Sequence, residues 1–381
     1  MRFLHTADWH LGRIFNARSL LEDQRHLLDQ LVGLVAQRKP DAVLIAGDVF
    51  DRAVPPPEAV ALLSEVLSRI VIGLRTPVLM IAGNHDSGER LGFGAPLLAA
   101  GGLHLAGPAG QVATLRLADA HGPVDVIGLP YAEPAEVRAL HALDDTPDHA
   151  ESMRLQLDAL RARPDKAART VLVGHAFVMG GEGCDSERPL SVGGSGAIGA
   201  EVFAGFDYVA LGHLHRPQTF AGGRVHYSGS LMKYSLSEVD QAKSVSLVEL
   251  DGNGAVSIER IALEPLRALR ILEGSLEDLL QRGAQDPRKE DYIHARLTDA
   301  GALLDPMSRL REVWPNALSI ERLVLSQRGE GLTRRASTRQ LAPAELFASF
   351  LREVADEDLD EARRAAFAEV LQTLGGERGA A

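Results

Sequence analysis

The sequence predicts an α/β protein, a two-sheet α/β sandwich followed by a small α/β cap domain and a C-terminal helical tail. In the first third, apolar runs typical of fully covered strands alternate with amphipathic helical stretches, which favours parallel strands joined by right-handed crossovers. Later strands are short and alternate apolar with polar residues, which favours antiparallel pairing. We therefore expect two sheets rather than one.

The expected elements follow one another in order. An amphipathic helix is predicted at 19–39, where Pro40 stops it, and further helices at 57–74, 95–100, 134–142 and 150–163. Strands are predicted at 2–7, 42–47, 78–83, 111–117, 124–128, 171–174, 208–212, 224–227, 244–250 and 256–261, the last three hairpin-like. The Gly-rich stretch 180–199 is expected to be a long loop, of the kind that is usually functional or mobile.

Four regions are expected, with boundaries at 1–265, 266–326, 327–341 and 342–381. The second is predicted as strand 269–272, helix 276–282, strand 292–297, helix 307–313 and strand 318–325. The third is a polar linker expected to lack fixed structure. The fourth carries two apolar helical stripes, formed by Leu346, Phe347, Phe350, Leu351 and Val354 and by Phe367, Val370, Leu371 and Leu374. So short a helical pair is expected to pack on the body or on a partner.

Composition narrows the class of protein. The chain has 381 residues, 45% of them hydrophobic, enough for a large core without disulfides. Its single cysteine, Cys184, can form neither an internal disulfide nor a thiolate zinc site. The net charge of −12 argues against nonspecific coating of DNA, although DNA remains possible as a substrate of a cation-binding site. No apolar run is long enough to span a membrane and the strand-like N-terminus leaves no room for a signal peptide, so a cytoplasmic protein is expected.

Five apolar strands end in Asp, Asn or His, which are ligands for divalent metals. The candidate metal ligands are Asp8, His10, Asp48, Asn84, His175, His213 and His215. A spacing of two residues, as in Asp8 and His10, places both side chains on one face of an extended chain. We expect Asp48 to bridge two ions. The first ion is assigned to Asp8, His10, Asp48 and His215, and the second to Asp48, Asn84, His175 and His213.

This donor set favours a two-metal hydrolase. Nitrogen and oxygen ligands without thiolate suit Mn²⁺, Fe²⁺ or Zn²⁺ better than Ca²⁺. Two ions about 4 Å apart clamp a phosphate and lower the pKa of a bridging water. His85 follows a ligand directly and is expected to protonate the leaving oxygen or to hydrogen-bond the transition state. Asp51 or Asp86 is expected to orient the ligands.

The remaining reactive residues receive simpler interpretations. His5 is expected to be a hydrogen-bonded core histidine, and Cys184 an inert loop thiol. Lys233 and Arg90 lie near strand ends and are weak candidates for phosphate contacts. Histidines without ligand neighbours are expected at the surface, namely His26, His104, His121, His141 and His149.

The order of motifs resembles a known family. The motifs are Asp-x-His at 8–10, Gly-Asp-x-x-Asp at 47–51, Gly-Asn-His-Asp at 83–86, Gly-His at 174–175 and Gly-His-x-His at 212–215. They are similar to the five motifs of the calcineurin-like metallophosphoesterases. More narrowly, segments 4–12, 46–51, 82–87, 208–215 and 227–230 resemble the SbcD family, the nuclease subunits of bacterial SbcCD complexes.

The resemblance implies an Mn²⁺-dependent nuclease, with Mg²⁺ as the other possible ion, that acts in DNA repair, replication and recombination. It implies 3′-to-5′ exonuclease activity on duplex DNA and endonuclease activity on single strands and hairpins. It makes 1–265 the metallophosphoesterase nuclease domain and 266–326 a DNA-contacting cap. It makes 342–381 the helical segment that docks on an SbcC-type, SMC-like coiled-coil ATPase. A homodimer of nuclease subunits is also implied.

Two other functions remain open. Asp51-Arg52 is also similar to the protein phosphatases, in which that arginine binds phosphate, although Trp9-His10-Leu11-Gly12 does not fit them. A metallophosphoesterase for small phosphoesters or cyclic nucleotides is therefore one alternative. The other is a non-catalytic DNA-end tether, against which the complete ligand set argues.

Overall fold

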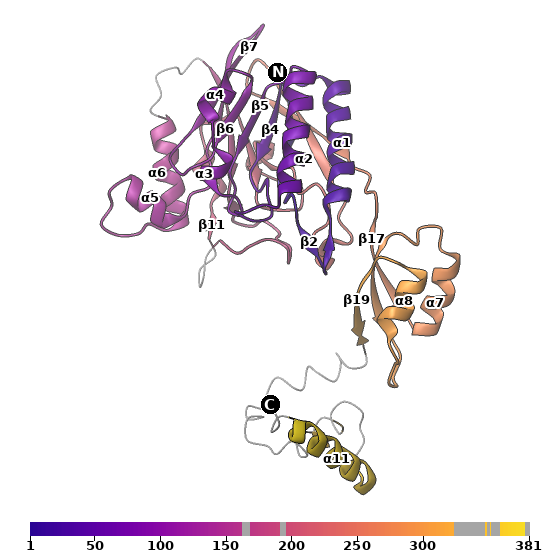
Figure 1. Cartoon of the computed structure of the whole chain (residues 1–381). Helices are drawn as coiled ribbons and strands as arrows, with labels where there is room; N and C mark the ends of the chain where they lie inside the picture. The colour runs from indigo at the N-terminus through magenta and orange to yellow at the C-terminus, as the bar shows by residue number, and fades with distance from the viewer. Residues whose placement is uncertain (162–167, 191–195, 324–346, 349–350, 352–358, 378–381) are drawn as a thin grey trace. The chain divides into compact units, whose positions relative to one another are not determined.

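The computed structural model describes residues 1–161, 168–190, 196–323, 347–348, 351 and 359–377. The expected linker at 327–341 and most of the first apolar stripe of the tail lie outside these residues. The chain divides into two compact units, Met1–Ala268 and Leu269–Ala381, of which the first holds both large sheets (Figure 1).

The first sheet has the strand order β16-β15-β1-β4-β5-β6. Its strands are β1 (Arg2–Thr6), β4 (Ala42–Ala46), β5 (Val78–Ile81), β6 (Leu103–Ala106), β15 (Ser244–Leu250) and β16 (Val256–Ala262). The strands β1, β4, β5 and β6 are parallel, whereas β15 runs antiparallel to both of its neighbours. Every residue of β4 is buried, as expected for an unbroken Val/Leu/Ile run in a central strand.

The second sheet has the order β13-β14-β12-β9-β8-β7. Its strands are β7 (Ala113–Asp119), β8 (Gly122–Gly128), β9 (Arg169–His175), β12 (Tyr208–Gly212), β13 (Gln218–Phe220) and β14 (Val225–Tyr227). Here β8, β9, β12 and β14 are parallel, and the two edge strands are antiparallel. The prediction of a two-sheet α/β sandwich is confirmed.

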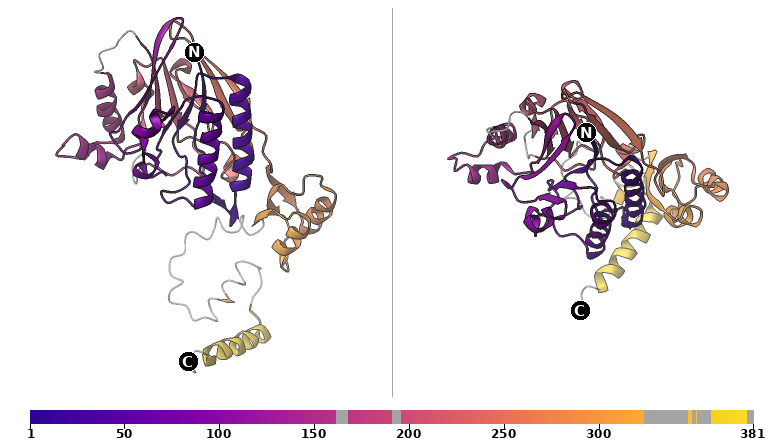
Figure 2. Two further views of the ribbon diagram at one scale, coloured as in Figure 1. Left: turned by 45° about the horizontal axis from the view of Figure 1, so that its top comes forward. Right: turned by 90° about the horizontal axis from the view of Figure 1, so that it is seen from above.

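Helices cover the sandwich on both sides (Figures 1 and 2). They are α1 (Leu21–Arg38), α2 (Pro57–Ser68), α3 (Gly88–Leu91), α4 (Ala95–Ala99), α5 (Pro134–Leu140) and α6 (His149–Arg161). Helix α1 buries Leu27, Leu31 and Val35 at helical spacing. Its C-cap residue Lys39 has a positive φ of 48° and donates its N–H to the Val35 carbonyl. Helix α2 continues as a π-helical turn, η1 (Arg69–Gly73). Short 3₁₀ turns are η2 (Ala200–Phe203), η3 (Ala221–Gly223) and η4 (Leu236–Glu238).

Two hydrophobic clusters among the described residues pack the second sheet of the first unit. One cluster lies between the sheets, where Leu44 and Leu79 of the first sheet meet Val126 and Val173 of the second. The other cluster packs the outer face of the second sheet against α6 and η2. Because both inner faces are dry and apolar, the two sheets are held face to face, and the carboxyl ends of their central strands lie at one end of the sandwich.

Several predictions of local structure were wrong. Strand β6 was not expected, and β14, expected to be hairpin-like, pairs parallel with β12. Strands of three or four residues show too little periodicity to reveal their direction. The first helix begins at Leu21 rather than at 19 because β2 (Ile14–Phe15) and β3 (Arg18–Ser19) form a small hairpin before it. The long loop is closed at its base by β10 (Phe177–Val178) and β11 (Ala197–Ile198).

The second unit contains the predicted strand–helix–strand–helix–strand pattern. Its elements are β17 (Leu269–Gly274), α7 (Leu276–Gln285), β18 (Tyr292–Leu297), α8 (Pro306–Val313) and β19 (Ala317–Arg322). The strands form a parallel sheet in sequence order, and Trp314 and Leu279 are fully buried in its core. The tail contributes α11 (Glu361–Glu377), and the Phe347 and Phe367 rings, one from each apolar stripe, stack at 4.1 Å.

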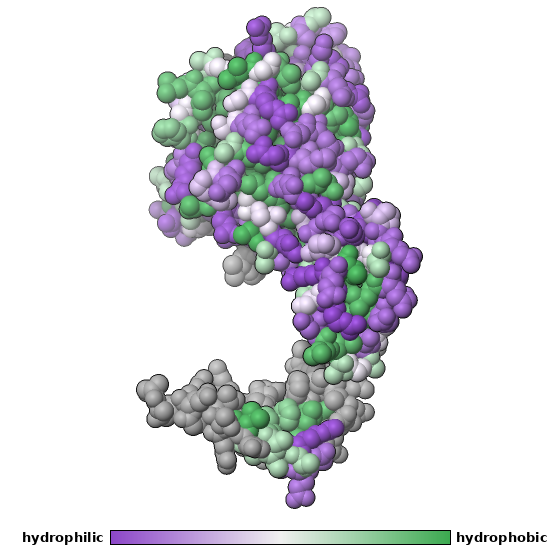
Figure 3. Space-filling view, turned by 45° about the vertical axis from the view of Figure 1, so that its right-hand side comes forward, coloured by the Kyte–Doolittle hydropathy of each residue, from purple (hydrophilic) through white to green (hydrophobic). Residues whose placement is uncertain are grey.

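One face of the molecule shows a mixture of polar and apolar side chains (Figure 3). Among the described helices, none is long and apolar enough to cross a bilayer.

Candidate metal centre

The structure brings all of the predicted metal ligands together at the carboxyl ends of five strands. They are Asp8 and His10 after β1, Asp48 after β4, Asn84 after β5, His175 at the end of β9, and His213 and His215 after β12. All are buried except Asn84, which is half-buried. The donors therefore come from both sheets and meet where the sheets face each other.

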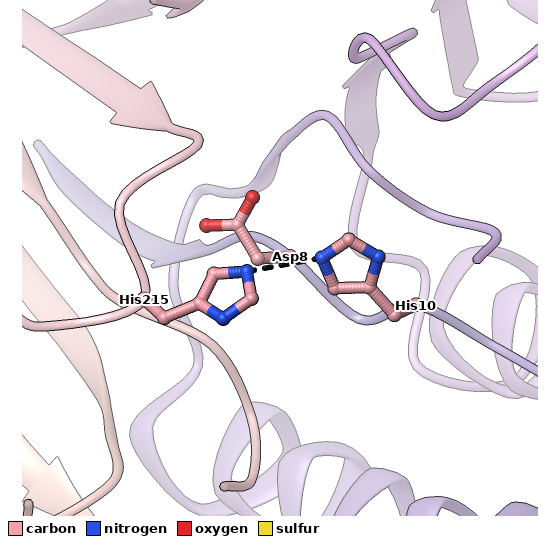
Figure 4. A group of neighbouring side chains, drawn as sticks. All are labelled: Asp8, His10 and His215. Atoms are coloured by element: carbon pink, nitrogen blue, oxygen red, sulfur yellow. Dashed lines mark hydrogen bonds between the residues drawn. The ribbon is translucent and has the colours of Figure 1, made fainter. Parts of the chain in front are cut away.

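One group of donors consists of Asp8, His10 and His215 (Figure 4). The Nε2 atoms of His10 and His215 point toward one another at 3.1 Å. One ligand atom from each of the three side chains lies within 4.8 Å of the others. The Oδ1 atom of Asp8 accepts a hydrogen bond from the His213 N–H at 2.9 Å. Its Oδ2 atom is buried without a hydrogen-bond partner among the described residues.

A second group surrounds Asn84. The Oδ1 atom of Asn84 lies 2.9 Å from His175 Nε2 and 3.2 Å from His213 Nδ1. Asp48 stands between the groups, because its Oδ2 atom is 3.6 Å from His175 Nε2 and 3.7 Å from His10 Nε2. Its Oδ1 atom accepts the His85 N–H at 2.9 Å. One oxygen of Asp48 therefore lies near a candidate ligand histidine of each group.

The backbone that presents these donors is not extended. Asp8, His10, Asp48 and His213 have positive φ angles of 53°, 44°, 49° and 102°. The expectation that Asp8 and His10 share a face of an extended chain was therefore wrong. Left-handed backbone at such residues costs about 1–3 kcal/mol each and persists where surrounding contacts enforce it. Here the N–H groups of Asp8 and His10 donate to the carbonyls of Gly47 and Asp48, at 3.1 and 2.9 Å.

Neighbouring groups orient the ligand side chains. His175 Nδ1 donates to the Ala46 carbonyl at 2.9 Å, which leaves Nε2 facing the site. His10 Nδ1 lies 3.8 Å from Asp51 Oδ1, and Arg13 holds that carboxylate at 3.0 Å. The Asp51 carboxylate thus lies near the His10 ring without a hydrogen bond to it, and its orienting role stays a prediction.

Asp86 acts on the backbone. Its carboxylate accepts hydrogen bonds from the N–H groups of Val49 at 3.1 Å, Phe50 at 2.9 Å and Gly83 at 2.9 Å. These bonds tie the loop of Asp48 to the loop of Asn84. Burial, followed by the charge of Asp48, raises the pKa of Asp86 to about 7.

The electrostatics of the site suit a bound cation. Burial raises the pKa of Asp8 well above its ordinary value, and the nearby charge of Asp48 raises it further. Burial also lowers the pKa of the ligand histidines His10, His175, His213 and His215. A neutral imidazole is the form that binds metal. The unpartnered Asp8 oxygen and the facing Nε2 atoms of His10 and His215 therefore fit divalent ions.

His85 lies beside these candidate ligands, and with His10 and Asp51 it forms a further group whose ligand atoms lie within 4.8 Å of one another. Its Nδ1 atom donates to the Asp51 carbonyl at 2.8 Å, and its ring lies 4.7 Å from the His10 ring, edge to face. Its Nε2 atom is buried without a partner among the described residues.

Sequence reasoning missed the polar residues that support the ligand loops. Gln24, from α1, donates to the carbonyls of Trp9 and His10 at 3.0 and 2.7 Å and accepts from the Gly12 N–H at 3.1 Å. It therefore holds the loop that carries His10. Gln24 and Asp23 are polar residues on the buried side of an amphipathic helix, and that was the signal in the sequence.

The other predicted polar residues have local partners. The Nζ atom of Lys233 donates to the Val239 carbonyl, and its contact with phosphate stays a prediction. Arg90 lines an apolar groove over α2 and α4. His5 is a buried core histidine that bonds the Tyr208 hydroxyl at 2.9 Å, as expected. Of the histidines expected at the surface, His121 and His141 are exposed, and His26, His104 and His149 are half-buried.

Comparison with known proteins assigns the family. Residues 1–217 match the calcineurin-like phosphoesterase family. Residues 265–355 match the SbcD_C family, described as the Type 5 capsule protein repressor C-terminal domain. Over 329 residues the chain is 34% identical to the SbcD subunit of the nuclease SbcCD from Staphylococcus epidermidis, covering 85% of this chain and 86% of the relative. This chain belongs to the SbcD family of calcineurin-like phosphoesterases. As an SbcD family member it is a metal-dependent nuclease.

Solved structures of other phosphoesterases are more distant. The calcineurin-like phosphoesterase YfkN from Bacillus subtilis is 13% identical, with 69% of this chain and 90% of that chain covered and a TM-score of 0.38. A dimetal phosphatase from Danio rerio is 14% identical, with 70% and 98% covered and a TM-score of 0.43. Likenesses this low add nothing to the evidence for SbcD membership.

Proposed function

We propose that this chain is the Mn²⁺-dependent nuclease subunit of an SbcCD-type complex. It hydrolyses phosphodiester bonds of DNA as a 3′-to-5′ exonuclease on duplexes and as an endonuclease on single strands and hairpins. The role is in DNA repair, replication and recombination. The observation that carries the proposal is the convergence of buried nitrogen and oxygen donors from both sheets around Asp48.

The site residues take the following roles in this proposal. The metal ligands are Asp8, His10, Asp48, Asn84, His175, His213 and His215. When bound, two divalent ions, Mn²⁺ or Mg²⁺, supply charge stabilisation for the phosphate and an ionised water. His85 is the catalytic residue: its Nδ1–H stays on the Asp51 carbonyl, and Nε2 carries the proton that goes to the leaving oxygen. Asp51 and Asp86 hold the ligand loops.

The remaining regions serve partners. We assign DNA contact to the α/β cap at 266–326 and docking on the SbcC-type, SMC-like ATPase to the segment 342–381, which 327–341 links to the cap. The stacked rings of Phe347 and Phe367 support a tail in which the two apolar stripes meet. We place the complex in the cytoplasm.

A homodimer of nuclease subunits is part of the proposal. An apolar groove of about 620 Å³ lies over α2, η1, α3 and α4. Around it Ile72, Phe93 and Leu97 are 76%, 84% and 82% exposed. A contiguous apolar patch of this kind marks an interaction surface. As part of this proposal we assign it to a second copy of this chain, and in a symmetric dimer the same patch is buried on both subunits.

The activity test uses the full chain with Mn²⁺, with and without its ATPase partner. Duplex DNA labelled at the 5′ or the 3′ end, and a hairpin with a labelled loop, separate exonuclease polarity from endonuclease cutting. Shortening from the 3′ end that stops on chelation is the expected result. Strong turnover of p-nitrophenyl phosphate esters with intact DNA would instead establish a small-substrate phosphoesterase.

A further inference from the structure

The long loop that follows β10 contacts one of the candidate metal ligands, His215. The Ser186 hydroxyl oxygen lies 2.8 Å from Nδ1 of His215. The Glu187 carboxylate accepts the His215 backbone N–H at 2.7 Å. On the other side, Lys243 Nζ donates to the His215 carbonyl at 2.8 Å. His215 is thus fixed through its ring and through both of its backbone polar groups.

The next residue in this hydrogen-bond network, Glu238, determines which groups donate and which accept. The Ser186 hydroxyl also lies 2.6 Å from Oε1 of Glu238, which forms an ion pair with Lys243 at 2.6 Å. An ionised carboxylate only accepts hydrogen bonds, so Ser186 donates to Glu238. Its oxygen is then free to accept from the Nδ1–H of His215. The lone pair of His215 must therefore lie on Nε2, the atom that faces His10.

The hydrogen bonds that run from Glu238 through Ser186 to His215, here called the relay, are shielded from water. Ser186, His215, Glu238 and Lys243 are all buried, so water does not replace a lost partner easily, and an unmade hydrogen bond keeps its full penalty. Glu238 Oε1 also accepts from the Tyr234 N–H at 3.0 Å and from Ser235 Oγ at 2.9 Å. The carboxylate is therefore held in one position whether or not Ser186 is present.

Arg13 connects the loop of Ser186 to Asp51, which follows β4. Its guanidinium donates to the Ser186 carbonyl at 3.4 Å and to Asp51 Oδ1 at 3.0 Å. It also lies over the Tyr234 ring, 5.2 Å from the centroid. Ser186 thus joins the part of the site built by β12 to the part built by β1 and β4.

We propose that Ser186 and Glu238 are positioning residues that fix the tautomer and orientation of His215 for metal binding. A carboxylate–serine–imidazole relay performs the task that a carboxylate bonded directly to the imidazole performs in other metal sites. The proposal rests on the proposed function only in taking His215 as a metal ligand. It assigns a role to Ser186, a residue of the long loop that nothing in the sequence singles out.

The test measures Mn²⁺ binding by electron paramagnetic resonance and calorimetry on the full chain. Ser186→Ala is expected to weaken one of two Mn²⁺ sites by about 10–100-fold and to leave the other unchanged. Ser186→Thr, which keeps the hydroxyl, is expected to bind like the wild type. If Ser186→Ala does not fold, Ser186→Cys provides the same test, because a thiol is a weak donor. Arg188→Ala, exposed on the same loop, is the control for loop substitution.

A second measurement reads the tautomer without metal. Long-range proton–nitrogen NMR of histidine-labelled protein is expected to show His215 protonated at Nδ1 in the wild type and as a tautomer mixture in Ser186→Ala. Unchanged Mn²⁺ affinity at both sites, or an unchanged tautomer, overturns the positioning role. A wild-type protein that binds two Mn²⁺ ions and cuts no DNA refutes the nuclease proposal alone. A wild type that binds no Mn²⁺ refutes both.

Discussion

His85 donates its Nδ1 hydrogen to the carbonyl oxygen of Asp51, 2.8 Å away. Because a carbonyl only accepts hydrogen bonds, this contact fixes which nitrogen of His85 turns toward the site. The same residue donates its backbone N–H to Asp48. The catalytic candidate and the proposed bridging ligand are therefore held together by backbone groups that a side-chain substitution leaves in place.

This arrangement separates catalysis from metal binding. His85→Ala keeps the backbone bond to Asp48, so we expect Mn²⁺ stoichiometry to be unchanged while DNA cleavage falls about 10²–10⁴-fold, the range for a lost general acid. Calorimetry and a gel-based cleavage assay measure the two quantities. His141→Ala, an exposed histidine at the end of α5, is the matched control. Full cleavage by His85→Ala would remove this residue from the mechanism.

Asp48 is expected to be needed for both ions. Asp48→Asn retains the shape and the oxygen that accepts from His85, but it removes the charge that lies between the two groups of donors. We expect fewer than two Mn²⁺ ions per chain and a loss of cleavage greater than about 100-fold, the upper end for residues that only support a ligand. Metal content by mass spectrometry after dialysis decides this. Asp145→Asn, in an exposed loop, should behave like the wild type.

Gly47 has no room for a side chain. Its φ is 89°, and a Cβ atom there would lie 2.5 Å from His175 Nδ1. Gly47→Ala is therefore expected to displace His175, to weaken Mn²⁺ binding and to cost about 1–3 kcal/mol of stability. Gly33→Ala is the opposite control, because nothing lies within 4 Å of its Cβ position in α1, and it should stabilise by about 0.5–1 kcal/mol. Urea unfolding measures the free energy of unfolding of the two variants, and equal changes in both would contradict the prediction.

His226 should make the sandwich sensitive to acid. It is buried and bonds Ser246 Oγ at 2.7 Å, and burial, followed by the charge of Arg260, lowers its pKa from 6.5 to about 3. The unfolded chain then binds a proton near pH 6.5 that the folded chain does not bind. Stability is therefore full above pH 6.5 and is lost as the pH falls toward 3, by about 2 kcal/mol at pH 5.

The measurement for His226 is the free energy of unfolding as a function of pH. His226→Asn should flatten the slope between pH 6.5 and 5, although it lowers stability at pH 7. His141→Asn, exposed, should keep the wild-type slope. A wild-type protein whose stability does not change over this interval would show that His226 is not held neutral.

The proposed dimer depends on the apolar groove. Leu97→Asp places a charge on an 82% exposed side chain of α4, so it should leave the fold intact and prevent association, since charge is excluded from the centre of such interfaces. Light scattering measures the mass of the wild type and the variant. Val54→Asp, also exposed but outside the residues that line the groove, is the control. A monomeric wild type at micromolar concentration would argue for another occupant of the groove.

Much of the sandwich and the site was predictable because both follow local rules. An apolar run ending in Gly-Asp or Gly-Asn-His is readable without knowledge of the fold, and parallel strands place such ends at one edge. The directions of β6 and β14 were not readable, because four and three residues leave no period to measure. The left-handed backbone at Asp8 and His10 was also hidden, since backbone hydrogen bonds from the neighbouring loop impose it.

The supporting residues were unpredictable for a different reason. Ser186 and Glu238 are ordinary loop residues in the sequence, and they acquire a role only because folding places them beside His215. Gln24 has the same character, since its partners lie in a loop before the helix that carries it. Long-range polar contacts of this kind have no local pattern.

The position of the candidate metal site between the two sheets has a consequence for the stability of the protein. A cation bound by His10, after β1, and by His215, after β12, would connect the two sheets. It would have to be released before the sheets separate. A ligand that binds only the folded chain adds about 2.7 kcal/mol to the free energy of unfolding at a free concentration one hundred times its Kd. Loss of the metal would then lower the stability of the folded chain as well as silence the enzyme.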